Sequence, residues 1–217
     1  LNTPLAAMLL RVQMMRERAG QPSRANDLER LEAGISSCRH FVQRLLEFSR
    51  PVAVQKQPEG VAHTIESVVS FLAPSLAAKQ ARLSLDLTAA DGDRVLADRN
   101  QIEALLTILL SNALDAIAPG GSIGVRCHRP ATGRIEIQIA DHGCGISAAE
   151  LPHVFEPFFT TKGLGTGTGL GLAIARNIVM EHAGSVRLES KLHQGTTVFV
   201  ELPLWAGNSH RPNGDEP

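Results

Sequence analysis

The chain has 217 residues, of which 43% are hydrophobic, and a formal net charge of −1 at pH 7. This length suits one large or two modest domains, and the hydrophobic content is enough for a sizeable core. The near-neutral charge excludes a basic, polyanion-binding surface as the dominant feature, so we expect no nucleic acid among the partners.

The cysteines and the apolar runs bear on the cellular compartment. Cys38, Cys127 and Cys144 are odd in number and far apart, without C-x-x-C spacing. This pattern argues against a disulfide framework or a zinc site and favours a reducing, cytoplasmic compartment. No apolar run reaches the roughly 18 residues of a membrane span, so we expect membrane attachment only through segments absent from this sequence. Because the sequence opens in mid-pattern at Leu1, we expect it to be part of a longer protein.

Residues 1–51 have the pattern of a helical hairpin. Apolar residues recur at alternating steps of three and four over 5–19 and again over 28–45, with a Gly-Gln-Pro-Ser break between the two arms. Such a seam needs a partner, and we expect a homodimer in which two hairpins form a four-helix bundle. Packing of the hairpin on the rest of the same chain is the alternative.

The stretch 51–60 is polar and contains Pro51 and Pro58, which indicates a linker over residues 52–60. Beyond them the periodicity predicts helices over about 61–80, 98–118 and 170–182, and a strand over 82–87. Two strand pairs follow from alternation and turn residues, 122–128 with 134–141 and 185–190 with 196–204. This is an α+β pattern, with helices on one face of a mixed sheet and the other face open, and we predict a disordered tail over 205–217.

Four stretches of the second domain are polar or glycine-rich where a core would not require it. They are Asn112 within an apolar helix, DHGCGI at 141–146, VFEPFFTTK at 154–162 and GLGTGTGLGL at 163–172. Each stretch also has a purely structural explanation, in the same order: an amide that caps neighbouring backbone, a turn, phenylalanines of the core, and a loose loop. The glycine run lacks the Lys-Ser/Thr end of a P-loop and the spacing of a dinucleotide fingerprint, so phosphate binding there needs another fold.

In this order the four stretches resemble the N, G1, F and G2 boxes of histidine-kinase ATP-binding domains. GTTVFVELP at 195–203 is similar to the closing strand of that domain, and LNTPL at 1–5 to the latter part of the H box of the hairpin. The likeness implies the α/β sandwich shared with DNA gyrase and the MutL proteins. It also implies a two-component sensor histidine kinase core: a hairpin over 1–51, a linker over 52–60 and an ATP-binding domain over 61–204.

The resemblance implies ATP and Mg²⁺ as cofactors and assigns a role to each matching residue. The expected ATP-binding residues are Asn112, Asp141, Gly143, Gly145, Ile146, Lys162, Gly163, Gly165, Gly167, Gly169, Leu170, Gly171 and Thr197. Among them, Asn112 is the expected magnesium ligand, Asp141 the acceptor for the adenine amine, and Thr197 an adenine-side hydroxyl. Residues 163–169 would form a lid over the triphosphate, with Phe155, Phe158 and Phe159 at a hinge or domain contact.

The H-box likeness concerns phosphoryl transfer. It implies transfer from ATP to a histidine and then to an aspartate on a response-regulator receiver domain, with Thr3 orienting water for the phosphatase reaction. None of the eight histidines stands at the acceptor position, which the likeness puts immediately before Leu1. We therefore expect this polypeptide to bind ATP without phosphorylating itself. His40 is expected to be a helix-surface residue, and Cys144 a small filler rather than a redox group.

The sequence departs from the family pattern at two positions on the Asn112 helix. Ile108 stands where many relatives have Asn, and Asp115 where a basic residue is frequent, which bears on the efficiency of ATP use. A gyrase-like hydrolase would need a carboxylate at position 108, and Ile108 cannot supply one. The other alternative is a scaffold or pseudokinase that docks through its hairpin and binds no nucleotide.

Overall fold

The computed structural model describes Val12, Gln13, Ile35 and residues 55–90, 92–130, 133–162 and 168–207. The chain divides into two compact units, Leu1–Ala53 with Glu156–Leu170, and Val54–Phe155 with Gly171–Pro217. Of the expected hairpin, Val12, Gln13 and Ile35 are described and are helical. The rest of residues 1–54 and the tail from residue 208 lie outside the described residues, and with them the predicted bundle.

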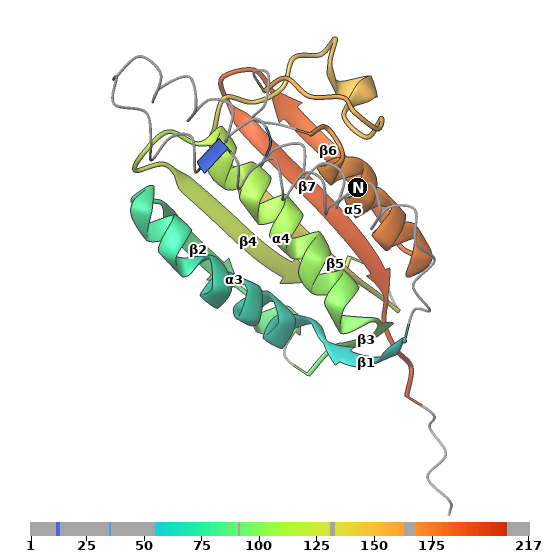
Figure 1. Ribbon diagram of the computed structural model, residues 1–217. Coiled ribbons are helices and arrows are strands. Elements are labelled where there is room, and N and C mark those ends of the chain that lie inside the picture. Colours follow the sequence, from blue (N-terminus) through green and yellow to red (C-terminus); the bar gives the residue numbers. More distant parts are fainter. Residues whose placement is uncertain are drawn as a thin grey trace, which may run out of the picture. The chain divides into compact units, whose positions relative to one another are not determined.

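A five-stranded sheet forms the centre of the second unit, in the order β2-β4-β5-β7-β6 (Figure 1). Its strands are β2 (Arg82–Asp86), β4 (Ser122–His128), β5 (Arg134–Asp141), β6 (Ser185–Lys191) and β7 (Gly195–Pro203). The pair β2–β4 is parallel and the other three pairs are antiparallel. Both predicted β-hairpins, β4–β5 and β6–β7, are confirmed.

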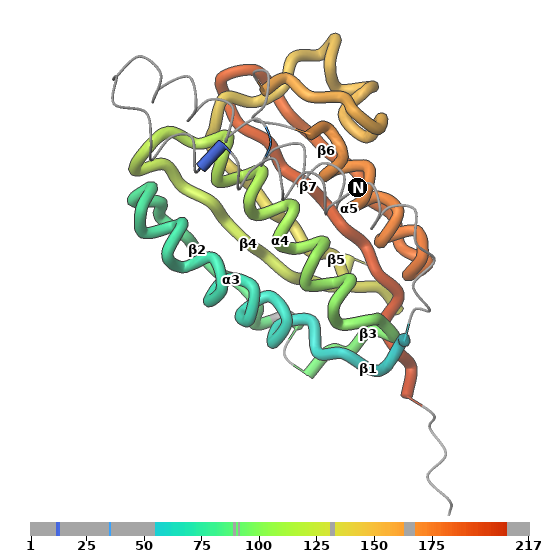
Figure 2. The backbone as a smooth tube through the Cα atoms, in the orientation of Figure 1, coloured from blue at the N-terminus to red at the C-terminus, as the bar shows by residue number. Residues whose placement is uncertain are grey.

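A second, two-stranded sheet is formed by the strands that come directly before the first two long helices. In it β1 (Gln57–Gly60) pairs antiparallel with β3 (Arg94–Ala97), beside the N-terminal ends of these helices (Figure 2). Residues 57–60 were assigned to the linker, and this part of the assignment needs correction. The segment is polar and contains Pro58, so its strand conformation depends on partner residues that lie 34 to 40 positions further along the chain, from the pair Gly60–Arg94 to the pair Gln57–Ala97.

Three helices, α3 (Val61–Ala78), α4 (Arg99–Ala116) and α5 (Gly171–Glu181), cover one face of the sheet (Figure 1). Short 3-10 turns, η1 (Thr88–Ala90) and η2 (Leu151–His153), lie in the connections. Helix α4 begins directly after Asp98, whose carboxylate accepts hydrogen bonds from the backbone amides of Asn100 and Gln101 at 3.0 and 3.3 Å. This N-cap satisfies two amides of the first turn that lack an intrahelical acceptor.

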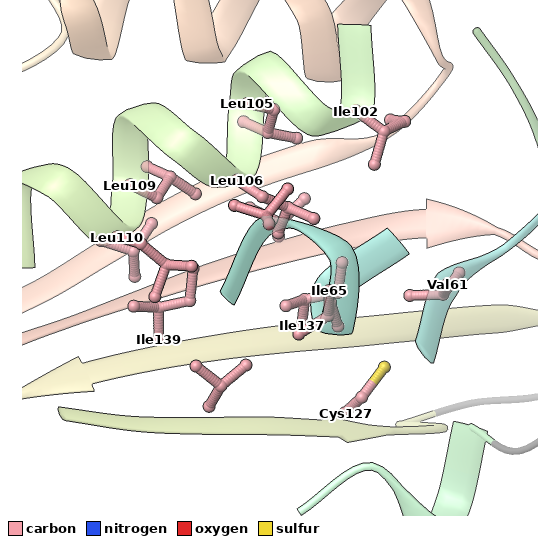
Figure 3. Packing of buried hydrophobic residues seen from close by; sticks show 14 of the residues in the cluster. Val61, Ile65, Ile102, Leu105, Leu106, Leu109, Leu110, Cys127, Ile137 and Ile139 are labelled. Atoms are coloured by element: carbon pink, nitrogen blue, oxygen red, sulfur yellow. The ribbon is translucent and has the colours of Figure 1, made fainter. Parts of the chain in front are cut away.

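The core lies between these helices and the sheet (Figure 3). Five residues at helical spacing on the inner face of α4 are buried, namely Ile102, Leu105, Leu106, Leu109 and Ala113. They pack with the β5 residues Ile137 and Ile139. Helix α3 is, among the described helices, the one long and apolar enough to cross a membrane, and its Ile65 and Val68 are buried in this core.

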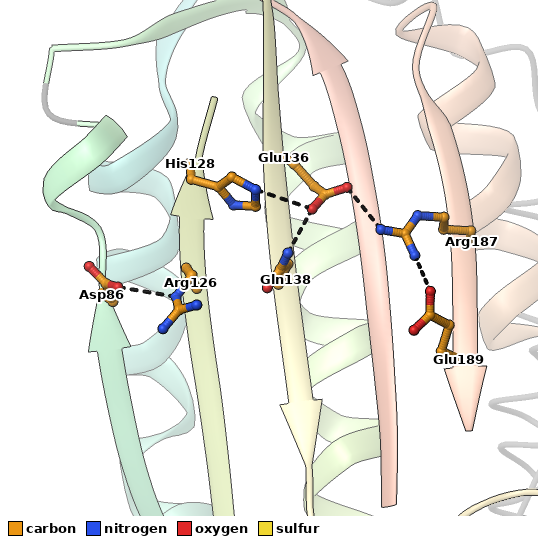
Figure 4. A network of polar contacts seen from close by, with 7 residues as sticks. All are labelled: Asp86, Arg126, His128, Glu136, Gln138, Arg187 and Glu189. Atoms are coloured by element: carbon orange, nitrogen blue, oxygen red, sulfur yellow. Dashed lines mark hydrogen bonds and ion pairs between the residues drawn. The ribbon is translucent and has the colours of Figure 1, made fainter. Parts of the chain in front are cut away.

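The opposite face of the sheet is open within this unit and polar (Figure 4). Glu136 of β5 is only 3% exposed although it lies on this face. Its carboxylate accepts hydrogen bonds from Gln138 at 2.7 Å and from Arg187 at 3.3 Å, and His128 lies 3.6 Å away. Arg187 also lies over the ring of Phe199, 3.4 Å from its centroid. The buried charge is therefore paired, as its desolvation requires.

A hydrogen-bonded anchor joins the start of this unit to the ends of two helices. The backbone amide of Gln55 donates to the Asp98 carboxylate at 3.1 Å, and the Asp98 amide donates to Nε2 of buried His182, also at 3.1 Å. The Nδ1 atom of His182 lies 2.7 Å from the Ile178 carbonyl oxygen. Because that carbonyl can only accept, His182 carries its proton on Nδ1.

Candidate nucleotide-binding site

Asp141 is the last residue of the central strand β5, on the face of the sheet that the helices cover. It is 8% exposed, and its carboxylate accepts a hydrogen bond from the Gly143 amide at 2.8 Å. Burial raises the pKa of Asp141 above the ordinary value, and backbone hydrogen bonds from Gly143 and Thr196 and the proximity of His142 oppose that shift. The result is a partly desolvated acceptor, the group that the sequence predicted for an adenine amine.

The loop after Asp141 lies between the C-terminal end of α4 and the turn from β6 to β7. A Cβ atom on Gly143 would come within 2.4 Å of the carbonyl oxygen of Ala116, the last residue of α4. That oxygen accepts a hydrogen bond from the Cys144 amide at 3.1 Å. Gly145 has φ +65°, and a Cβ there would lie 2.1 Å from the Lys191 carbonyl oxygen. The two glycines of D-x-G-x-G are therefore required by close backbone contacts on both sides.

Asn112 lies on α4, one turn before Ala116, and faces the start of α5. The position of a Cβ on Gly171, the first residue of α5, is 3.9 Å from Asn112 Nδ2 and 3.3 Å from Cγ2 of Ile108. The amide side chain thus lies beside a helix N-terminus, where backbone N–H groups without intrahelical acceptors favour anions. Ile108, at the position where many relatives have Asn, places a hydrocarbon side chain beside Gly171.

The predicted adenine-side hydroxyl needs correction. Thr197 pairs with Ala140 in the β5–β7 register, so its side chain lies on the open face, away from Asp141. Thr196 pairs with Asp141 itself and is 9% exposed. The hydroxyl beside Asp141 therefore belongs to Thr196, because a shift of one residue along a strand exchanges the two faces.

The other unit contains the described part of the expected lid. The Phe158 amide donates to the Gly169 carbonyl oxygen at 2.9 Å, and the two residues have φ of +72° and +66°. This contact joins positions 158 and 169, which lie on either side of residues 163–167 in the sequence. Lys162 is exposed, and its amide lies 3.2 Å from Thr160 Oγ1. The expected lid glycines Gly163, Gly165 and Gly167, and Thr3 of the hairpin, lie outside the described residues.

The remaining predicted residues are divided between the two units. Phe155 is half-buried in the sheet unit, whereas Phe159 is half-buried and Phe158 is 56% exposed in the other. Leu170 is buried at the end of the lid segment. Ile146 is half-buried at the end of the Asp141 loop, and its amide donates to Ser190 Oγ at 2.8 Å. Sequence reasoning missed Ser190, which no local motif marks.

Comparison with known proteins identifies this arrangement. The family described as histidine kinase-, DNA gyrase B- and HSP90-like ATPase matches residues 97–206, just over half of the chain. This chain belongs to that ATPase family. The match includes α4 with Asn112, the Asp141 loop, the glycine-rich segment and both strands of the β6–β7 hairpin.

Within the ATPase family the similarity is to histidine kinases, and the chain is a histidine-kinase catalytic core. It is 32% identical over 205 residues to the signal transduction histidine-protein kinase AtoS of Escherichia coli, which is 94% of this chain and 33% of that protein. Mycobacterial sensor histidine kinase MprB matches 69% of this chain and 97% of the solved chain, with a TM-score of 0.62 and 27% identity. The chain thus spans about a third of the length of AtoS.

Histidine kinase ThkA, solved in complex with response regulator protein TrrA, matches 93% of this chain and 57% of its own, with a TM-score of 0.67. At 22% identity this likeness shows the fold. It supports the predicted α+β fold, whereas the histidine-kinase assignment rests on the sequence matches.

Proposed function

We propose that this chain binds ATP with Mg²⁺ as the catalytic core of a sensor histidine kinase. The observation that carries the proposal is the grouping of three features in one unit: buried Asp141, the amide of Asn112 and the N-terminus of α5 at Gly171. They offer an acceptor for a base, an oxygen for a hard cation and a dipole for phosphates. Membership of the ATPase family supports the same reading.

Adenine recognition belongs to the end of the central strand β5. Asp141 accepts a hydrogen bond from the exocyclic amine, and Gly143 and Gly145 let the loop that contacts the purine pack closely against Ala116 and Lys191. Ile146 contributes apolar contact to the base. Thr196 takes the role first given to Thr197, because it lies beside Asp141 on the helix-covered face.

Phosphate binding belongs to α5 and the lid. The first amides of α5, from Gly171 onward, lack intrahelical acceptors and would bind the phosphates, as at other phosphate-binding helix ends. Lys162 adds a positive charge, and residues 163–169 close over the triphosphate. We place the hinge at the hydrogen bond between Phe158, before the segment, and Gly169, at its end.

These protein donors could hold Mg²⁺ only together with ligands from the nucleotide and from water. Among the described residues there is no group of three or more His, Cys, Asp or Glu side chains that could hold a metal ion. Asn112 would therefore provide one oxygen ligand, and phosphate oxygens and water would supply the others. The chemistry that Mg²⁺ would supply there is neutralisation of phosphate charge, and Asn112 would hold the ion beside the start of α5.

The phosphoryl group passes from ATP to a histidine and then to an aspartate of a response-regulator receiver domain. The solved complex of ThkA with TrrA supports this class of partner. We propose further that residues 1–51 dimerise as a four-helix bundle, that Thr3 serves the phosphatase reaction, and that the core acts in the cytoplasm, where ATP is available. The ATP-binding domain then extends over residues 57–204, with β1 included.

Calorimetric titration of the 217-residue chain with ADP and ATP, with and without Mg²⁺, tests the proposal. Replacing Asp141 by Asn should weaken ADP binding about 10- to 100-fold, because a charge-assisted hydrogen bond is lost. The control is Asp86→Asn on the exposed strand β2, which should leave ADP binding unchanged. If the wild-type chain bound no nucleotide, the scaffold alternative would replace this proposal. Labelled γ-phosphate should not be incorporated into this polypeptide.

A further inference from the structure

The turn between β6 and β7 holds the nucleotide loop through one side chain. Ser190 Oγ on β6 lies 2.8 Å from the amide nitrogen of Ile146, 2.9 Å from the carbonyl oxygen of Gly195 and 2.8 Å from Oγ1 of Thr196. Its three partners come from the loop and from the start of β7. Two backbone approaches reinforce this contact: the His193 amide donates to the Cys144 carbonyl oxygen at 2.7 Å, and Gly145 closely contacts the chain at Lys191.

The direction of each hydrogen bond follows from the chemistry of its partners. A serine hydroxyl donates once and accepts up to twice. The Ile146 amide can only donate, and the Gly195 carbonyl can only accept, so the single Ser190 proton points to Gly195. Ser190 must then accept from Thr196, whose hydroxyl proton is directed toward Ser190 and away from Asp141.

The two side chains that meet here, Asp141 and Thr196, therefore both present acceptors to a ligand. Thr196 pairs with Asp141 across β5 and β7, and its hydroxyl has only lone pairs to offer any further partner. The Asp141 carboxylate likewise only accepts when ionised. A base whose exocyclic amine lies beside Asp141 and Thr196 can donate hydrogen bonds to these acceptors. A base with a carbonyl oxygen at the same place would bring a further acceptor against them.

We infer that Ser190 is a positioning residue that sets base specificity by holding the 141–146 loop and by fixing the Thr196 hydroxyl as an acceptor. This inference rests on the proposed nucleotide-binding function. Ser190 acts through Thr196 and Ile146. Its loss should free the Thr196 proton and loosen the loop, while the Asp141 carboxylate remains in place.

The test compares ADP and GDP binding, in the presence of Mg²⁺, by the 217-residue chain and three variants. Ser190→Ala should weaken ADP binding about tenfold, as expected for one lost hydrogen bond of typical strength, with little change for GDP. Ser190→Thr retains the hydroxyl and should retain the ADP preference. Ser185→Ala, at the exposed start of the same strand, is the matched control and should behave as wild type.

The ratio of the two affinities separates a specific role from a general one. A Ser190→Ala variant with a lower melting temperature but an unchanged ADP-to-GDP ratio would show a merely structural serine and overturn the inference. Failure of Ser190→Thr to restore the ratio would do the same. If the wild-type chain bound neither nucleotide, the proposed function would fail first and the inference with it.

Discussion

Gly145→Ala probes the close backbone contact that shapes the nucleotide loop. Gly145 has φ +65°, a conformation that costs an alanine about 1–2 kcal/mol. The new methyl group would also lie 2.1 Å from the Lys191 carbonyl oxygen, which belongs to the backbone and cannot rotate away. The β6–β7 turn must therefore move relative to the loop.

That movement puts two hydrogen bonds at risk, from the Ile146 amide to Ser190 and from the His193 amide to Cys144. Each contributes about 1 kcal/mol, so the total destabilisation should be about 3–4 kcal/mol. Gly133→Ala is the matched control. Gly133 has φ +79°, but a Cβ there would have nothing within 4 Å, so only the conformational cost of about 1–2 kcal/mol applies.

Urea denaturation of both variants measures this difference, and titration with ADP measures its effect on the site. We expect Gly145→Ala to lose about 2 kcal/mol more than Gly133→Ala, and ADP binding to weaken only in Gly145→Ala. Equal free energies of unfolding for the two variants, within about 0.5 kcal/mol, together with normal ADP binding would refute the close contact.

Four further outcomes follow from buried and paired groups. Because burial raises the pKa of Asp141 and the ionised form binds the base, ADP affinity should fall on acidification at a higher pH than for an ordinary aspartate. A raised pKa in the folded state means that folding favours the protonated carboxyl of Asp141. The free energy of unfolding therefore falls as the pH rises through this pKa and the carboxyl ionises. Asp141→Asn, which is neutral, should then be at least as stable as wild type at pH 7. Burial raises the pKa of Cys127 to about 12, so N-ethylmaleimide at pH 7 should label exposed Cys144, with protection by ADP, and leave Cys127 unmodified in peptide mass spectra. Arg187→Ala should lower the free energy of unfolding by about 2 kcal/mol, through lost contacts to Glu136 and Phe199, with ADP affinity unchanged.

Local sequence patterns predicted the elements that carry their own signal. Helix α4 combines a capping aspartate, Asp98, with a buried stripe from Ile102 to Ala113, so its limits and inner face could both be inferred. Strand β1 could not, since its four residues are polar and its ordering depends on pairing with β3.

The candidate site divides in the same way. Asp141 and Asn112 occupy motif positions, and the structure places Asp141 at the end of a strand and Asn112 beside the start of α5. The choice between Thr196 and Thr197 depends on strand register, which a run of two threonines does not reveal. Ser190 lies 44 residues from Ile146, and its role depends on how the β6–β7 turn meets the loop.

The anchor of Gln55 on Asp98 and His182 lies at the ends of α4 and α5 that are remote from Asn112 and Gly171. Helix α5 has 11 residues and so is about 16 Å long, and hydrogen-bonded helices of this length bend little. A displacement of Gln55, at the start of this unit, should therefore move α4 and α5 as rigid helices. The opposite ends of these helices carry Asn112 and Gly171, which are proposed to bind metal and phosphate. A displacement of Gln55 should therefore change the distance and the alignment between Asn112 and Gly171.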